Sequence, residues 1–177
     1  LKPGRYKLTG VLKDEFSGNI GVLQQGLDIP PLPKAELAAS SLKLFIGARK
    51  AEADADLTEP FTIAGGLKLY PSLDRQFETG KGPVGFFMKI YNCGFASDTG
   101  APAVGANLSV KDGDGKQVLF AQLLRSSLRL VGNRVMVLHQ IDTQLLAPGQ
   151  YTAELSAYDA IQDQEVRQVA RFQVAAG

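Results

Sequence analysis

The chain has 177 residues, of which 45% are hydrophobic and 21% are charged, and its formal net charge at pH 7 is +1. This composition is typical of a globular protein that buries a core, and the near-zero charge gives no electrostatic basis for binding nucleic acid or an anionic membrane. No apolar run reaches the roughly 18 residues of a membrane span. The single cysteine, Cys93, cannot form an intrachain disulfide, so the fold does not depend on one.

Residues 1–30 have the pattern of a β-hairpin. They open with Leu1-Lys2-Pro3-Gly4-Arg5-Tyr6, which is the sequence form of a tyrosine corner. In that motif the ring packs under a sharp turn and the hydroxyl bonds back to nearby backbone. Alternating strands then flank the turn formers Ser17-Gly18-Asn19. Asp14 precedes this turn, and we expect it to cap local backbone amides.

A second copy of this pattern begins 145 residues later. Leu146-Ala147-Pro148-Gly149-Gln150-Tyr151 repeats the opening, and Asp159 repeats Asp14. Apolar positions recur on the same strand face: Leu8 with Ala153, Leu12 with Ala157, Phe16 with Ile161, Leu27 with Phe172, and Ile29 with Val174. Each copy predicts the last two strands of a β-sandwich. Because no sandwich precedes the first copy, we expect it to be the remnant of a similar, preceding domain.

A proline-rich stretch separates the first hairpin from the rest of the chain. Ile29-Pro30-Pro31-Leu32-Pro33 ends the second strand, since prolines donate no ladder hydrogen bonds and stiffen the backbone. We therefore expect two domains: a terminal hairpin with its linker over residues 1–33, and a β-sandwich over residues 34–177.

Residues 34–177 carry the alternation of a sandwich. Apolar periodicity and turn residues predict an all-β fold of seven or eight antiparallel strands, the number in an immunoglobulin-like sandwich. The first of these strands covers residues 40–46, with Leu42, Leu44 and Ile46 inward. Val84 to Tyr91 is bulky on both faces, as in a central strand. The others are expected over residues 67–71, 104–111, 117–122 and 134–143, and in the closing hairpin.

No catalytic motif survives scrutiny, and we expect no enzyme. Asp98-Thr99-Gly100-Ala101 matches the Asp-Thr-Gly of aspartic proteases, and Leu130-Val131-Gly132-Asn133 resembles a second element of that family. Such an aspartate must follow a buried hydrophobic strand, but Cys93 to Ser97 is not one, and the two elements stand too close together. The lone His139 alternates with apolar neighbours, which indicates a packed side chain. No Gly-x-Ser-x-Gly elbow occurs.

Acidic residues two apart suggest calcium at two places, and at both we favour a structural interpretation. Glu52, Asp54 and Asp56 lack the glycine and the later glutamate of a calcium loop, so we expect an ordinary loop. Asp112 and Asp114 more simply supply the positive-φ residues of a hairpin turn. One histidine and one cysteine cannot build the usual zinc site. We therefore expect no cofactor.

The order of these features resembles the C-terminal regions of the exported bacterial proteins called VWFA-related. The shared order is Leu-x-Pro-Gly-x-Tyr, strand, Asp, turn, strand, proline-rich linker and new sandwich. Arg75-Gln76-Phe77, Phe86 to Asn92 and Lys111-Asp112-Gly113-Asp114-Gly115-Lys116 resemble further stretches of that family. The von Willebrand A domain and its metal-binding motif are absent, so no ligand residue carries over. The resemblance implies a non-enzymatic β-module of a secreted or cell-envelope protein, extracellular or periplasmic.

Two functions from different classes remain. The leading hypothesis is a structural or protein-interaction module of a larger exported protein, whose partners are its own upstream domain or neighbouring copies. The alternative is a carbohydrate-binding sandwich. Sugar platforms need exposed aromatic rings, and with no tryptophan only Tyr70, Tyr91 and Tyr158 are available.

The apolar face of the first hairpin needs a cover, because isolated hairpins are marginal in water. Either it packs on residues 34–177, or it joins a neighbouring chain by strand addition or swapping. The short, stiff linker favours the second option and hence a homo-oligomer.

Overall fold

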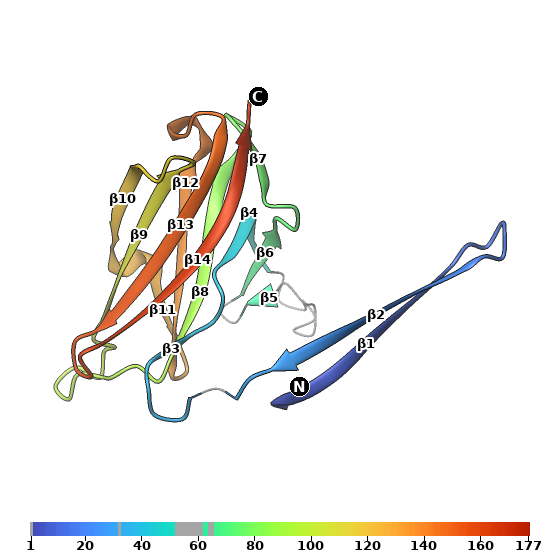
Figure 1. Cartoon of the computed structure of the whole chain (residues 1–177). Coiled ribbons are helices and arrows are strands. Elements are labelled where there is room, and N and C mark those ends of the chain that lie inside the picture. Colours follow the sequence, from blue (N-terminus) through green and yellow to red (C-terminus); the bar gives the residue numbers. More distant parts are fainter. Residues whose placement is uncertain (1, 32, 52–61, 64–65) are drawn as a thin grey trace. The chain divides into compact units, whose positions relative to one another are not determined.

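The computed structural model describes residues 2–31, 33–51, 62–63 and 66–177 (Figure 1). The chain divides into two compact units, Leu1–Lys34 and Ala35–Gly177. The expectation of an ordinary loop at Glu52, Asp54 and Asp56 concerns positions outside the described residues. In the described part, no helix is long and apolar enough to cross a membrane.

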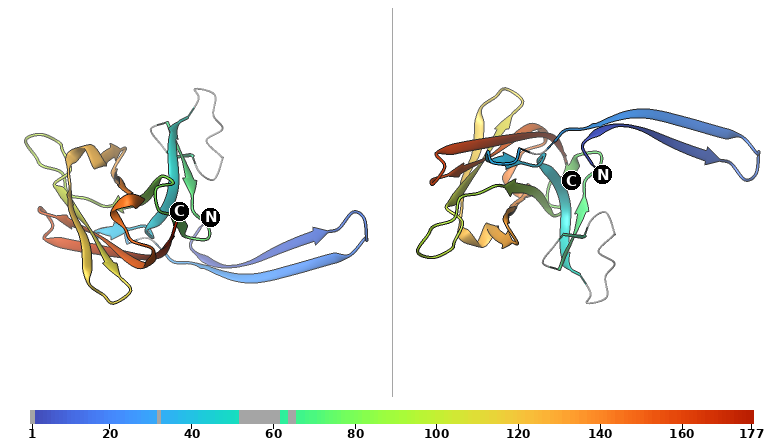
Figure 2. Two further views of the ribbon diagram at one scale, coloured as in Figure 1. Left: turned by 90° about the horizontal axis from the view of Figure 1, so that it is seen from above. Right: turned by 90° about the horizontal axis from the view of Figure 1, so that it is seen from below.

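The first unit is a single antiparallel hairpin. Strand β1 (Gly4–Lys13) pairs with β2 (Ile20–Ile29) along its whole length, from Gly4 opposite Ile29 to Lys13 opposite Ile20. Figure 2 shows the hairpin as a continuous two-stranded ribbon in both views. Gly18 takes a φ of 71° in the turn, a conformation that costs glycine little.

The second unit contains two β-sheets. Five strands form one sheet, in the order β10-β9-β13-β14-β7, and seven form the other, in the order β11-β12-β8-β4-β6-β5 with β3 beside β8. The first sheet consists of β7 (Gln76–Glu78), β9 (Val104–Asp112), β10 (Gln117–Leu123), β13 (Gly149–Asp159) and β14 (Gln164–Ala175). The second consists of β3 (Ala38–Ala39), β4 (Lys43–Lys50), β5 (Thr62–Ile63), β6 (Leu67–Pro71), β8 (Pro83–Tyr91), β11 (Leu128–Val131) and β12 (Arg134–Asp142).

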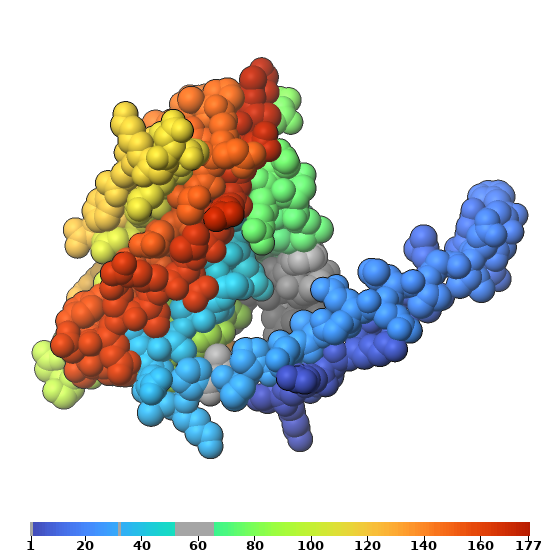
Figure 3. Space-filling model, in the orientation of Figure 1, coloured from blue at the N-terminus to red at the C-terminus, as the bar shows by residue number. Residues whose placement is uncertain are grey.

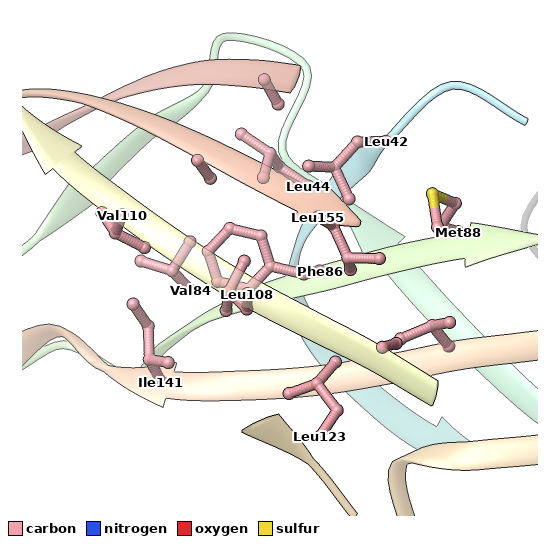
Figure 4. Packing of buried hydrophobic residues seen from close by; sticks show 14 of the residues in the cluster. Leu42, Leu44, Val84, Phe86, Met88, Leu108, Val110, Leu123, Ile141 and Leu155 are labelled. Atoms are coloured by element: carbon pink, nitrogen blue, oxygen red, sulfur yellow. The ribbon is translucent and has the colours of Figure 1, made fainter. Parts of the chain in front are cut away.

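The two sheets pack face to face around one main core, which confirms the prediction of an all-β sandwich. Figure 4 shows side chains of both sheets meeting between them, with Phe86 and Val84 of β8 beside Leu108 of β9 and Leu155 of β13. All four are fully buried. The tyrosine-corner strand β13 is the centre of its sheet, between β9 and β14, and its inward residues therefore define much of the core.

Strand β8 is buried on both faces, as its sequence predicted. A second apolar cluster lies on its other side, formed by Phe45, Leu69, Phe87 and Met136. The Phe45 ring lies directly on Gly85, where a Cβ atom would come within 2.3 Å of it. The expectation that Ile46 faces inward is wrong, because this side chain is 55% exposed. A register shift in β4 between Phe45 and Gly47 changes the alternation there.

One strand pair departs from the expected antiparallel arrangement. The short β7 runs parallel to β14, with Phe77 opposite Val174. Like β3, β5 and β11, β7 was missed in the sequence because a strand of two to four residues shows no alternation. Two 3-10 turns, Arg125–Ser127 and Thr143–Leu145, are the helical segments of the described residues, and the second leads into the tyrosine corner.

Candidate functional site: the duplicated hairpin

The two tyrosine corners make the same hydrogen bond. The Tyr151 hydroxyl donates to the carbonyl oxygen of Ala147 at 2.6 Å, and the Tyr6 hydroxyl donates to that of Lys2 at 2.7 Å. Each acceptor lies four residues before its tyrosine. The rings differ in environment, because Tyr151 is 6% exposed whereas Tyr6 is only partly buried. Burial, with the Asp112 carboxylate as a smaller cause, raises the pKa of Tyr151.

The Pro-Gly pair between the accepting carbonyl and the tyrosine has the same position and surroundings in both copies. Pro3 and Pro148 are exposed and follow the accepting carbonyl directly. A Cβ atom on Gly4 would lie 3.8 Å from its tyrosine ring, and one on Gly149 would lie 3.9 Å from its own. The corner is therefore a local structure that forms in the same way in the two units.

The aspartates of the two turns cap equivalent amides. Asp159 Oδ1 accepts from the amides of Ile161 and Gln162, at 2.9 and 3.1 Å. Asp14 Oδ1 accepts from those of Phe16 and Ser17, at 2.8 and 3.3 Å. The Phe16 amide and then the Ser17 hydroxyl lower the pKa of Asp14.

The hairpins also share their strand register. Gly149 pairs with Val174 and Tyr151 with Phe172, as Gly4 pairs with Ile29 and Tyr6 with Leu27. The equivalent turn residues Gly18 and Asp163 both have a positive φ, of 71° and 54°. The two hairpins are thus one structure formed twice.

They differ in what lies beside and under them. Figure 3 shows β13 and β14 side by side along one face of the sandwich. The outer edge of β13 pairs with β9, from Tyr151 opposite Asp112 to Asp159 opposite Val104, and β14 pairs with β7. The Phe172 ring stacks on Tyr151 and meets Phe77 and Phe86 edge to face.

The turn of the second hairpin is clamped by a distant loop. Asp159 Oδ2, in a fully buried side chain, accepts from the amide of Gly94 at 2.5 Å. A Cβ atom on Gly94 would lie 2.8 Å from Cβ of Ile161, so the contact requires glycine. Gln162 Nε2 donates to the carbonyl oxygen of Asn92 at 2.6 Å. No sequence pattern predicts this clamp, because it joins residues 65 positions apart.

Among the described residues of its own unit, the first hairpin makes no such contacts. The second oxygen of Asp14 accepts from the Ser17 hydroxyl, three residues later, at 2.9 Å. Phe16, the counterpart of Ile161, is fully exposed. Four leucines on the face that corresponds to the buried face of β13–β14 remain between 44% and 79% exposed: Leu8, Leu12, Leu23 and Leu27. This set defines the hairpin face.

The other candidate residues belong to different elements of the second unit. Asp98 is exposed in a loop closed by the bridge between Phe95 and Pro102. Burial lowers the pKa of His139, whose Nδ1 lies 3.5 Å from the Ser127 hydroxyl.

The aspartates of the β9–β10 turn have a structural role that differs from the expected one. Asp112 Oδ1 accepts from the amides of Asp114 and Lys116, and the positive φ of the turn, 81°, belongs to Gly115. The expectation that the two aspartates supply the positive-φ residues is therefore wrong. Across the described residues, no group of three or more His, Cys, Asp or Glu side chains could hold a metal ion.

The three candidate tyrosines do not share one sheet. Arg49 lies over the Tyr70 ring, 5.4 Å from its centroid, and Arg134 lies over the Tyr91 ring at 5.5 Å. Tyr158 belongs to the other sheet, and its hydroxyl donates to Asp163 at 2.7 Å. Two of the three rings thus already have a guanidinium group on one face, and the third lies in a different sheet.

No protein-family model matches this chain, and no curated protein matches it in sequence.

Proposed function

We propose that the chain is a non-catalytic β-sandwich module of a larger secreted or cell-envelope protein, and that it acts through protein contact at the hairpin β1–β2. The observation that carries the proposal is the hairpin face of Leu8, Leu12, Leu23 and Leu27, which no described residue of its own unit covers. Clustered exposed apolar side chains of this kind mark interaction surfaces.

The free strand edges support the same function. Both edges of β13–β14 are paired, whereas β1 and β2 pair only with each other. Unpaired edges beside an apolar face are templates for another strand. A protein partner can satisfy both needs at once, which a small sugar cannot.

The strand order supports an immunoglobulin-like classification. In sheet order, β4, β8, β12 and β11 correspond to strands A, B, E and D, and β9, β13 and β14 correspond to C, F and G. The corner tyrosine then begins strand F, where such domains carry it. Modules of this architecture commonly serve adhesion and assembly outside the cell, and the resemblance to VWFA-related proteins supports the same location.

Site-specific photo-cross-linking in cells that produce the protein tests this function. A photoreactive residue at Leu12, on the hairpin face, is compared with one at Thr9, on the opposite face of β1. We expect a cross-linked protein at position 12 only, and its loss when Leu8 and Leu27 are both replaced by serine. Absence of any cross-link, together with saturable binding on a glycan array, would favour the carbohydrate alternative.

A further inference from the structure

This inference rests on the proposed function and names the kind of partner. We propose that the hairpin β1–β2 closes a second β-sandwich, supplied by a partner that lacks its own last two strands, and that this partner is not the sandwich of another copy of the chain. The inference rests on β13–β14, because this equivalent hairpin is part of a complete sandwich and shows which elements cover its apolar face.

The partner must supply an edge strand. In the sandwich, β9 runs antiparallel to β13 from Tyr151 to Asp159. The equivalent edge of the first hairpin is Tyr6 to Asp14, so the partner strand lies antiparallel to β1 over that range. Beneath it, a sheet with an apolar inner face covers the hairpin face, as β8 and β12 contribute to the core under β13–β14.

The partner must also supply a glycine at the turn. Asp159 holds the Gly94 amide with its second oxygen while Ile161 packs against the glycine. Asp14 keeps the same cap, and Phe16 extends from the same position of the turn. In the completed sandwich, Asp14 Oδ2 therefore accepts from a backbone amide of the partner and Phe16 covers that residue.

Side-chain size excludes the sandwich of a second copy. At three successive inward positions β13 carries Ala153, Leu155 and Ala157, all fully buried. The equivalent positions of β1 carry Leu8, Gly10 and Leu12, so large and small are inverted. Gln25 likewise stands where the sandwich has the buried Ala170. Placed in this slot, the first hairpin would overpack two positions, leave cavities in place of Leu155 and Phe172, and bury an amide.

A graft within the full chain tests these statements. Residues 146–175 are replaced by the sequence of residues 1–30, either unchanged (the direct graft) or with Leu8→Ala, Gly10→Leu, Leu12→Ala, Gln25→Ala and Leu27→Phe (the reset graft). We expect the reset graft to unfold cooperatively in urea and to protect its grafted amides from exchange. We expect the direct graft to lose that protection by at least about 100-fold, since several misfits combine.

A matched control separates these effects from general intolerance of the strand. T152K/E154T/S156V gives β13 the outward residues of β1 at Lys7, Thr9 and Val11, and it should fold like the native chain. If this control folds and the reset graft does not, the hairpin is not a closing hairpin and the proposal is overturned. If the direct graft folds as well as the reset graft, the size argument fails and a second copy becomes the occupant.

Light scattering on the native chain addresses the remaining occupants. We expect a monomer whose β1 and β2 amides exchange quickly. A dimer that L8S/L27S dissociates would overturn the proposal in favour of a second copy, and a monomer with a protected hairpin face would overturn it in favour of intrachain packing. None of these results removes protein contact as the function, which the cross-link at Leu12 decides separately.

Discussion

The hairpins β1–β2 and β13–β14 share a corner, a register and a capped turn, yet one is exposed and the other forms the centre of a core. The shared features all lie within a hairpin: Tyr6 and Asp14 bond to residues four or fewer positions away, and the two strands pair with each other. The features that differ depend on distant strands. Local geometry in this protein is thus encoded locally, whereas burial depends on what the hairpin is placed against.

The largest expected difference in stability between the hairpins concerns the equivalent positions Phe172 and Leu27. Phe172 and Leu27 are equivalent, but Phe172 is 2% exposed and contacts three rings, whereas Leu27 is 44% exposed. We expect F172A to lower the free energy of unfolding of the sandwich by about 3–5 kcal/mol. L27A should change it by no more than about 0.5 kcal/mol. Urea unfolding followed by circular dichroism measures both, and equal losses would mean that the two hairpins are equally covered.

The two turn aspartates should differ next most strongly. Replacing the buried Asp159 by alanine removes the acceptor of three backbone amides, among them that of Gly94. We expect D159A to destabilise the sandwich by about 3 kcal/mol, because buried donors are left unsatisfied. D14A, at an exposed position, should leave the urea midpoint of the sandwich unchanged. A D159A variant as stable as the native chain would show that water replaces the carboxylate in the clamp.

Much of this fold could be predicted because its signals are local and periodic. The sequence predicted the alternation of β9 and β12, the burial of β8 on both faces, and the repeated corner. The exposure of Ile46 was not, since a single register shift in β4 reverses the alternation after Phe45. Strands of two to four residues also left no pattern.

The candidate site was predicted only in part, for the same physical reason. The corner and the turn cap of each copy follow from a few adjacent residues. The clamp of Asp159 on Gly94 does not, because the loop that carries Gly94 meets the turn only after both sheets have formed. The inverted order of large and small side chains in β1 and β13 could not be interpreted from the sequence, because the register is needed to show which positions face inward.

The corner hydroxyls give a smaller contrast. Tyr151 and Tyr6 make the same bond, but only Tyr151 is buried. We expect Y151F to lower the free energy of unfolding of the sandwich by about 1 kcal/mol, the usual contribution of one hydrogen bond. Y6F should leave the sandwich unaffected and speed amide exchange only near Gly4. Unchanged stability of Y151F in urea would mean that the Ala147 carbonyl finds another donor.

The smallest effect is the pH dependence of the first turn, and it tests whether that turn forms without a covering sandwich. The Phe16 amide and the Ser17 hydroxyl lower the pKa of Asp14 from 3.8. Because the pKa is lower in the folded turn than in the unfolded chain, the ionised carboxylate stabilises the turn at pH values above the unfolded-state pKa. This stabilisation disappears as the pH falls through the folded-state pKa. Carbon-13 NMR titration of the side chain should therefore give a value below 3.8, and S17A should move it back towards 3.8 by removing one donor. A native value at or above 3.8 would show that the turn opens in solution, and the local corner and cap would then need the partner sandwich to form.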